Sequence, residues 1–221
     1  MNKVDLILKY ERWLSMVYRI WGRNKTRISK GNTFVVGNAF MKRCKITIQG
    51  VGNVVEIESG LTRLTNCTVT INGSYSHIVI GSKSNLNHCH LYMEDDNGKI
   101  LIGKHVTTTG TTNLAVIEGK TIQIGNDCLL STDISFRVGD SHSIISVETQ
   151  KRINPSQNIT VGNHVWIGHG VKILKGSRIS DESIVTTGAI VTGKEFPANV
   201  VIAGVPAKVV KENVTWSAQR V

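Results

Sequence analysis

The 221-residue chain suits one sizeable domain, and its 21 glycines against 3 prolines and few aromatic residues indicate a fold with many tight turns. No stretch reaches the roughly 18–20 apolar residues that span a bilayer, no secretory signal opens the chain, and the four cysteines form no CxxC pair, so we expect a cytoplasmic protein without a metal site. The formal net charge of +10 comes without a nucleic-acid-binding signature, so we expect a different anionic partner, such as a phosphate-bearing cofactor, an acidic polysaccharide or a membrane surface.

Residues 2–22 place apolar residues at roughly helical spacing among charged ones, which predicts a short amphipathic helix. The apolar residues are Val4, Leu8, Trp13, Val17, Ile20 and Trp21. We expect this helix to cap the open end of the repeat that follows, or to pack within an oligomer. Contact with a membrane surface stays open, at the inner face of the membrane, because cations surround the aromatic residues, namely Lys9, Arg12, Arg19, Arg23, Lys25 and Arg27.

A repeat fills the middle of the chain. The tetrad Ile-x-[Ile/Val]-Gly occurs at Ile78–Gly81, Ile100–Gly103, Ile122–Gly125 and Ile159–Gly162, with a degenerate copy at Val55–Glu58. The first four of these five copies, in chain order, are spaced by 23, 22 and 22 residues, which we interpret as a coil of about 18 residues with extra residues at one corner. Three cysteines follow the same spacing and should stack in a column of small apolar wall positions, namely Cys44, Cys67 and Cys89.

The polar stretch Gly139–Asn158 interrupts this repeat. The step from Gly125 to Gly162 is 37 residues, close to two coils, and the stretch has no periodicity of its own. We therefore expect a loop that leaves the coil near residues 139–158. Long loops in a regular scaffold commonly carry function.

From residue 161 an apolar residue recurs at every sixth position, at Val161, Ile167, Ile173, Ile179, Val185 and Val191. A small or compact residue follows each of the first five by four positions, at Val165, Val171, Ser177, Ser183 and Ala189. Six residues suit one short strand and a corner, so three units close a triangular coil of 18 residues. The branched residue of each unit should point inward.

The last segment, Pro206–Val214, has a proline where a helix would have its first turn, which predicts a short C-terminal helix. The expected organisation is an N-terminal helix and lead-in over residues 1–30, the coiled domain over 31–202, and a C-terminal turn and helix over 203–221.

Three segments together resemble the hexapeptide-repeat acyltransferases, and most of all the sugar O-acetyltransferases of bacterial surface polysaccharides. They are Val161–Val191, the motif Ala-Gly-Val-Pro-Ala-Lys at Ala203–Lys208, and Asp140–His142 in the loop. The resemblance implies an all-β, left-handed parallel β-helix that assembles as a homotrimer, with each active site between two neighbouring coils. It also implies transfer of an acetyl group from acetyl-CoA to a sugar hydroxyl of a capsular or O-antigen polysaccharide or its precursor.

Acetyl transfer to an alcohol needs a base for the hydroxyl proton and donors that hold the oxyanion. Histidine suits the first task because its ordinary pKa lies near working pH. A loop histidine is the catalytic base in the family, so the resemblance implies that role for His142, with Asp140 beside it in acceptor binding. The resemblance further places Trp166 at the thioester site and Asp133 at the acceptor.

For the cofactor, motif matching points to His169, Thr187 and Thr192 along one edge of the coil, since residues 169 and 187 are one 18-residue coil apart. Lys208 follows Pro206 where relatives direct a cation toward the nucleotide phosphates. If these residues have no catalytic or binding role, each is an ordinary side chain of the coil wall, of a corner or of the surface.

Four other functions stay open. The same cofactor would serve N-acetylation of an amino sugar, and a β-helix can also act as a scaffold or sugar binder without catalysis. A gamma-class carbonic anhydrase would need three histidines converging on zinc; His164 and His169 are five residues apart, but no third partner matches. A metal cluster of the remaining histidines is a further alternative, and these are His77, His88, His90 and His105.

Overall fold

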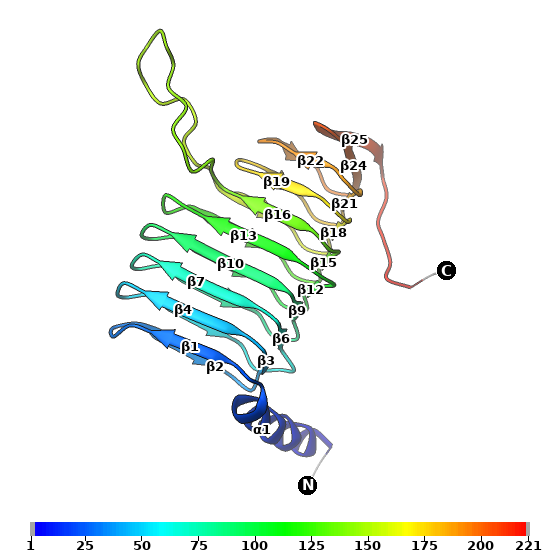
Figure 1. The fold of residues 1–221 in the computed structure, drawn as a ribbon. Helices are drawn as coiled ribbons and strands as arrows, with labels where there is room; N and C mark the ends of the chain where they lie inside the picture. The colour runs from blue at the N-terminus through cyan, green and yellow to red at the C-terminus, as the bar shows by residue number, and fades with distance from the viewer. Residues whose placement is uncertain (1–2, 220–221) are drawn as a thin grey trace.

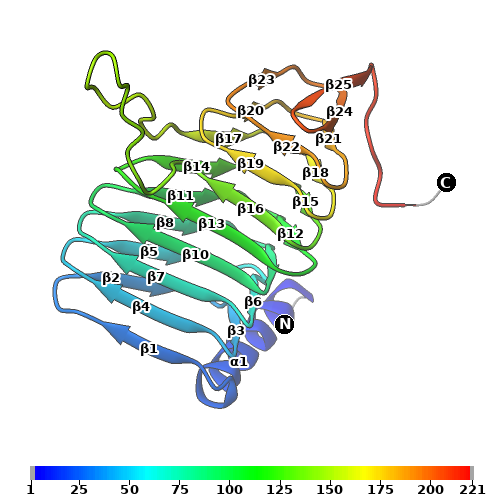
Figure 2. The same cartoon turned by 45° about the horizontal axis from the view of Figure 1, so that its top comes forward.

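The computed structural model describes residues 3–219, with the side chains of all of these except residues 3–9, 18 and 19. The chain winds into a triangular solenoid whose walls are three sheets of parallel strands (Figures 1 and 2). This confirms the triangular coil predicted from the repeat and the all-β, left-handed parallel β-helix that the resemblance implies. We call the walls sheets A, B and C in the order in which the chain visits them, and name each corner by the two sheets that it joins.

Each sheet takes one strand from each coil, in chain order. Sheet A contains β1 (Lys25–Ile28), β4 (Lys45–Gln49), β7 (Thr68–Asn72), β10 (Cys89–Glu94), β13 (Thr112–Val116), β16 (Ile134–Arg137), β19 (Lys172–Leu174) and β22 (Ile190–Val191). Sheet B contains β2 (Thr33–Val36), β5 (Val54–Ile57), β8 (His77–Ile80), β11 (Lys99–Ile102), β14 (Thr121–Ile124), β17 (Ile159–Val161), β20 (Arg178–Ile179) and β23 (Glu195–Phe196). Sheet C contains β3 (Phe40–Lys42), β6 (Arg63–Thr65), β9 (Asn85–Asn87), β12 (Thr107–Thr108), β15 (Leu129–Leu130), β18 (Trp166–Ile167), β21 (Ile184–Val185), β24 (Val200–Gly204) and β25 (Ala207–Glu212).

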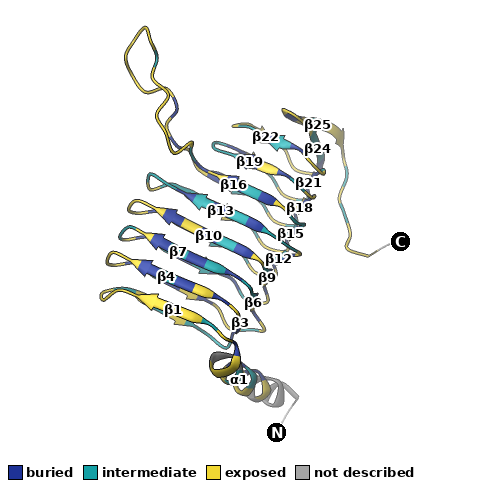
Figure 3. Cartoon of the chain, in the orientation of Figure 1, coloured by how far each residue is buried: buried dark blue, intermediate teal, exposed yellow. Residues whose placement is uncertain are grey.

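The six-residue repeat forms the core as predicted. Val161, Ile167 and Ile173 lie on sheets B, C and A in turn, and the next three apolar residues of the series repeat this order. All six side chains are at most 1% exposed, and buried positions recur on the strands of the coils after the first, whereas β1 is exposed throughout (Figure 3). Burial of one such branched side chain contributes about 1.5–3 kcal/mol, so the stacked coils share one continuous apolar core.

The longer repeat also forms one column. Val55, Ile78, Ile100, Ile122 and Ile159 are in register on successive strands of sheet B. The glycine of the tetrad is needed because the backbone turns directly against the next coil at the B–C corner. A Cβ on the tetrad glycine of β8 would lie 2.5 Å from the carbonyl oxygen of the tetrad glycine after β11.

The extra residues of the early coils are at the A–B corner. Eleven positions separate Lys45 on β4 from Glu56 on β5, whereas six separate their register equivalents, Lys172 on β19 and Arg178 on β20. The predicted excursion leaves at this same corner, between β16 and β17, and projects away from the solenoid (Figure 1). Both the corner insertions and the loop therefore lengthen one edge of the molecule.

Helix α1 (Lys3–Trp21) confirms the predicted N-terminal helix and packs against β3 at the first coil. Its Glu11 is buried and accepts hydrogen bonds from the backbone N–H groups of Gly60 and Leu61, at 2.8 and 2.9 Å. Trp13 and Trp21 are 56% and 79% exposed. The helix thus turns Glu11 toward the solenoid and exposes Trp13 and Trp21 to solvent. The side chains of Val4, Leu8, Lys9 and Arg19 lie outside the described residues.

The predicted C-terminal helix is wrong. Residues after Pro206 form β25, which pairs antiparallel with β24 and ends sheet C with a hairpin. The physical reason is a period-two pattern, since Ala207 is buried and Lys208 exposed, while β-branched Val209 and Val210 follow. Among residues 3–219, no helix is long and apolar enough to cross a membrane.

Candidate active site

The base of the loop at residues 139–158 is fastened to the coil by Asp140. Its carboxylate accepts hydrogen bonds from the Asn154 amide, at 2.8 Å, and from the Lys175 ammonium group of the coil above. The Lys175 contact and the Asn154 hydrogen bond together lower the pKa of Asp140 below its ordinary value. The same Asn154 amide donates to the backbone carbonyl of His142 at 2.8 Å. Asp140 therefore anchors the segment that carries His142.

A second ion pair fastens the other strand of the loop. Arg152 donates to the Glu118 carboxylate at 2.6 Å, and this hydrogen bond is the main cause of the lowered pKa of Glu118. Glu118 also accepts the backbone N–H of Ser156 at 3.2 Å. Both ends of the loop are thus held to the solenoid, while its tip extends into solvent.

His142 is exposed, and its backbone is fixed on both sides. Its N–H donates to the Asp140 carbonyl at 2.7 Å, and its carbonyl accepts from Asn154. Among residues 3–219 its imidazole ring has no hydrogen-bond partner. A fixed backbone with an unengaged ring leaves both ring nitrogens free to meet a substrate.

Trp166 projects from the outer face of sheet C and is 41% exposed. Its register neighbours are Leu129 on β15 and Ile184 on β21, so the indole ring stands in an apolar row. The ring of Trp216 from the C-terminal tail lies 6.1 Å from it at an angle of 43°. The exposed ring can therefore pack against a ligand on this face.

Trp216 was missed by the sequence analysis. It stacks on His164 with a centroid distance of 4.5 Å, and its indole N–H donates to the His164 carbonyl at 2.8 Å. Glu182 joins the contact by accepting hydrogen bonds from the Thr215 hydroxyl at 2.7 Å and pairing with His164 at 2.6 Å. These two contacts lower the pKa of Glu182. A tryptophan in an otherwise polar tail was the available sequence signal.

Two of the residues predicted for the cofactor do share an edge. His169 and Thr187 stack at the C–A corner, where the N–H of Gly188 donates to the His169 carbonyl at 2.8 Å. Asp133 is exposed at the same corner, one coil earlier. Thr192 contradicts the prediction of a single edge because it lies at the A–B corner, after β22. Lys208 is exposed on β25.

One copy of the chain does not bring all of these residues together. His142 extends from the A–B corner, whereas Trp166 lies on sheet C and His169 at the C–A corner. A six-residue spacing fixes which sheet a residue occupies but carries no information on contacts between copies. Within one copy, His142 and Trp166 therefore lie apart.

The histidines are dispersed over the surface. His164 lies at the B–C corner and His169 at the C–A corner, so this pair does not converge within one chain. The side chains of His88 and His105 contact Asn66 and Asp127, respectively. Within the described part of the chain, no group of three or more His, Cys, Asp or Glu residues is placed to hold a metal ion.

Comparison with descriptions of protein families finds no match. Comparison with individual proteins does. The chain is 35% identical over 189 residues to a polysialic acid O-acetyltransferase of Neisseria meningitidis. The aligned segment covers 76% of this chain and 87% of that protein. Among solved structures it is similar to the polySia specific acetyltransferase NeuO, with a TM-score of 0.76, 29% identity, and coverage of 89% of this chain and 88% of that one. The polysialic acid O-acetyltransferase OatWY gives a TM-score of 0.72, with 26% identity and 90% coverage of each chain.

Proposed function

The chain belongs to the hexapeptide-repeat sugar O-acetyltransferases, and we propose that it transfers the acetyl group of acetyl-CoA to a hydroxyl group of a bacterial surface polysaccharide, with His142 as general base. The observation that carries the proposal is the anchored loop itself. Asp140 and Asn154 hold the backbone of His142 in place while the imidazole ring stays exposed and unengaged. This is the arrangement that a base acting on an entering substrate needs.

In the proposed reaction the acceptor hydroxyl attacks the thioester carbonyl carbon while His142 takes the hydroxyl proton. The carbonyl oxygen becomes an oxyanion, which donors at the site stabilise. When the C–S bond breaks, the imidazolium returns the proton to the sulfur, and free CoA and the acetyl ester leave. Trp166 would pack against the thioester arm, and the corner residues His169 and Thr187 would lie along it. Asp133 would contact the acceptor and Lys208 the cofactor phosphates as part of this proposal.

We infer a homotrimer, in which the loop of one copy reaches the sheet C of the next. Support comes from the separation of His142 and Trp166 within one chain. The loop also exposes apolar side chains that water does not favour, since Ile144, Val147 and Ile153 are 54%, 88% and 61% exposed. A neighbouring solenoid would cover them.

The experiment measures free thiol from acetyl-CoA with a panel of surface-polysaccharide fragments, for the wild type and His142→Ala. We expect acceptor-dependent release that falls by about two or more orders of magnitude in the variant. Equal rates for the two proteins would remove His142 from the mechanism. Absence of release from both proteins with every fragment would reject the enzymatic function.

We also propose that α1 contacts an anionic membrane surface. Its outer side exposes Trp13, Ile20 and Trp21, and cations flank it at Arg12 and Arg23. Sedimentation with phosphatidylglycerol vesicles tests this. Trp13→Ala/Trp21→Ala should lose binding, whereas Tyr75→Ala, which removes another exposed ring far along the coil, should keep it. If the helix variant binds vesicles normally but loses its oligomer, a second copy of the chain occupies this face instead.

A further inference from the structure

The outer face of sheet C carries a straight row of side chains that continues past Trp166 to Ile184, and we call its segment from the first coil to Trp166 the column. The strand register aligns one residue from each coil, namely Phe40, Arg63, Asn85, Thr107, Leu129 and Trp166. Neighbouring strands lie about 4.8 Å apart, so the four strand spacings from Arg63 to Trp166 amount to about 19 Å. The column is long enough for several linked sugars.

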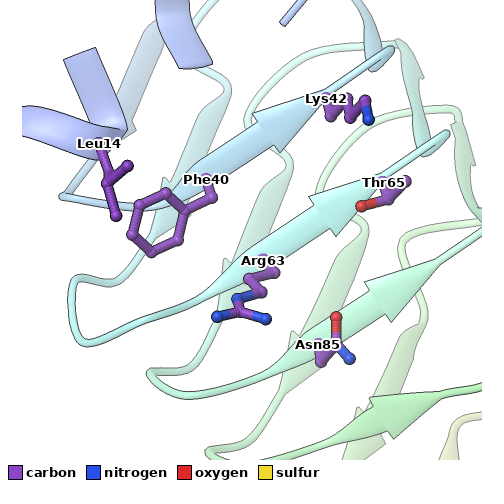
Figure 4. A pocket seen from close by; sticks show the side chains of 6 residues that line it. All are labelled: Leu14, Phe40, Lys42, Arg63, Thr65 and Asn85. Carbon is purple, nitrogen blue, oxygen red and sulfur yellow. The ribbon is translucent and has the colours of Figure 1, made fainter. Parts of the chain in front are cut away.

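A cationic pocket lies at the far end of this column. It has a volume of about 390 Å³ between α1 and the first three strands of sheet C, and Lys42 and Arg63 supply its charges (Figure 4). Leu14 and Phe40 form its apolar side, and the Arg63 guanidinium lies 5.9 Å from the centre of the Phe40 ring. Among the side chains that the structure describes, neither cation forms an ion pair and no carboxylate lines the pocket. Two unneutralised cations in one pocket attract an anion.

A second pocket lies toward the near end of the column, where it is lined by Trp216, whose ring is 6.1 Å from that of Trp166. Its volume is about 310 Å³, with Thr107 and Leu129 on the sheet and Trp216 of the tail on one side. His105 and Asp127, paired at 2.8 Å, add exposed polar groups at the corner. An aromatic ring beside hydroxyl, imidazole and carboxylate groups is suited to a hydroxyl-rich ligand.

Neutral hydrogen-bonding groups connect the two pockets. Asn85 and Thr107 occupy the column itself, and Thr65 and Asn87 occupy the parallel outward row above Lys42. Neither outward row of these strands contains a carboxylate. The face therefore offers amides and hydroxyls along its length and cations at the end distant from Trp166.

We propose that this face binds an extended acidic polysaccharide, with one sugar beside Trp166 and a carboxylate of a distant sugar held by Arg63 and Lys42. The proposal rests on the acetyltransferase function proposed above and names the acceptor class of that site. A guanidinium group fits a carboxylate with two parallel hydrogen bonds, and the neutral rows match the hydroxyl groups of the intervening sugars. A nucleic acid would need a series of stacking rings, and this column has rings only at its two ends.

The test compares Lys42→Ala/Arg63→Ala with Lys99→Ala, which removes an exposed cation from sheet B. The acceptors are sialic acid as a single sugar, a short oligomer of it and its polymer. Dextran, a neutral polymer, is the control for charge. We expect the KM for the acidic polymer to rise about tenfold in the double variant, with kcat and the KM for acetyl-CoA unchanged. The single sugar should be acetylated equally by all three proteins, and Arg63→Lys should fall between the wild type and the double variant.

Three results would overturn the proposal. They are equal KM values for the double variant and Lys99→Ala, an equal loss with the single sugar, and a raised KM for acetyl-CoA, which would assign the cations to the cofactor. Calorimetry measures binding of the acidic polymer in the absence of acetyl-CoA, when no acetyl transfer can occur. This measurement tests the polymer site independently of the proposed catalysis. Salt-dependent binding that the double variant loses supports the polymer site even if no acceptor is turned over, whereas absence of wild-type binding rejects the site even if catalysis is found.

Discussion

The first and last coils of the solenoid share one apolar core but differ in length and charge. Residues 1–65 contain 12 Lys and Arg against 4 Asp and Glu, a net charge of +8, whereas residues 66–221 contain 14 against 12, a net charge of +2. The last coils repeat every 18 residues, and the earlier coils repeat every 20 to 23. The regular end carries the residues proposed for chemistry, and the longer, basic coils supply a charged surface for recognition. A repeat scaffold can thus separate the two tasks along its axis.

The largest effect on stability is expected in the middle of the core. Phe136 on β16 is fully buried below the loop, while Phe34 in the first coil is only partly buried. Phe136→Ala should lower the free energy of unfolding by about 3–5 kcal/mol, because it leaves a cavity, and Phe34→Ala should cost less than half as much. Urea unfolding measures both. Equal losses would mean that the first coil is as tightly packed as the middle.

The loop anchor should give the next largest effect. Asp140→Ala removes the contacts to Lys175 and Asn154, so amide hydrogen exchange across residues 139–158 should become about tenfold faster at neutral pH. Because the pKa of Asp140 is lowered in the fold, its stabilisation is complete above the ordinary value of about 4 and is lost as the pH falls through the lowered value. Glu148→Ala, at the exposed loop tip, is the control. A loop that exchanges equally in both variants would show that Asp140 does not hold it.

A smaller change is expected in the C-terminal tail. Trp216→Ala loses the stacking on His164 and the hydrogen bond to its carbonyl, which should cost about 1–2 kcal/mol of local stability. Trp216→Phe keeps the ring but not the donor and should lose less. Protease cleavage rates after Glu212 report the opening of the tail. An identical cleavage rate for the wild type and Trp216→Ala would mean that the contacts of Trp216 with His164 do not stabilise the tail.

The smallest effect should come from the cysteines. Cys44, Cys67, Cys89 and Cys128 are buried free thiols, and burial raises the pKa of Cys89 and of Cys128 to about 12. Thiol reagents should therefore leave the native protein nearly unlabelled and react with all four groups in urea. Rapid labelling of the native protein would indicate that the coils open locally.

The sequence was sufficient for the solenoid because its periods act through sterics. Ile167 and Val185 must point inward because every sixth residue is buried. The residue after β8 must be glycine because a side chain there would collide with the backbone of the next coil. The hairpin after Pro206 was mispredicted because a proline at the start of the short segment Pro206–Val214 does not distinguish a helical turn from a strand. Its alternating burial decides the matter only when β24 is present as a partner.

The site was less predictable because its contacts cross coils and sheets. His142 and Asp140 could be found from their place in an excursion, but the turn of the Asp140 carboxylate toward Lys175, 35 residues away, has no local signal. Thr192 was predicted on the wrong edge because the prediction used its position in the motif and did not assign each residue to a sheet. The contact of Trp216 with His164 joins residues 52 positions apart and is likewise determined by tertiary packing.

The most direct test of the account mixes two inactive chains. His142→Ala and Trp166→Ala are co-expressed with different tags, and oligomers that carry both tags are purified and assayed with acetyl-CoA and an acidic polymer. If one copy supplies His142 and its neighbour supplies Trp166, each variant alone is inactive, whereas a mixed trimer regains one intact site, roughly a third of the wild-type rate. Mixed oligomers that form normally yet stay as inactive as either parent would contradict a site shared between copies.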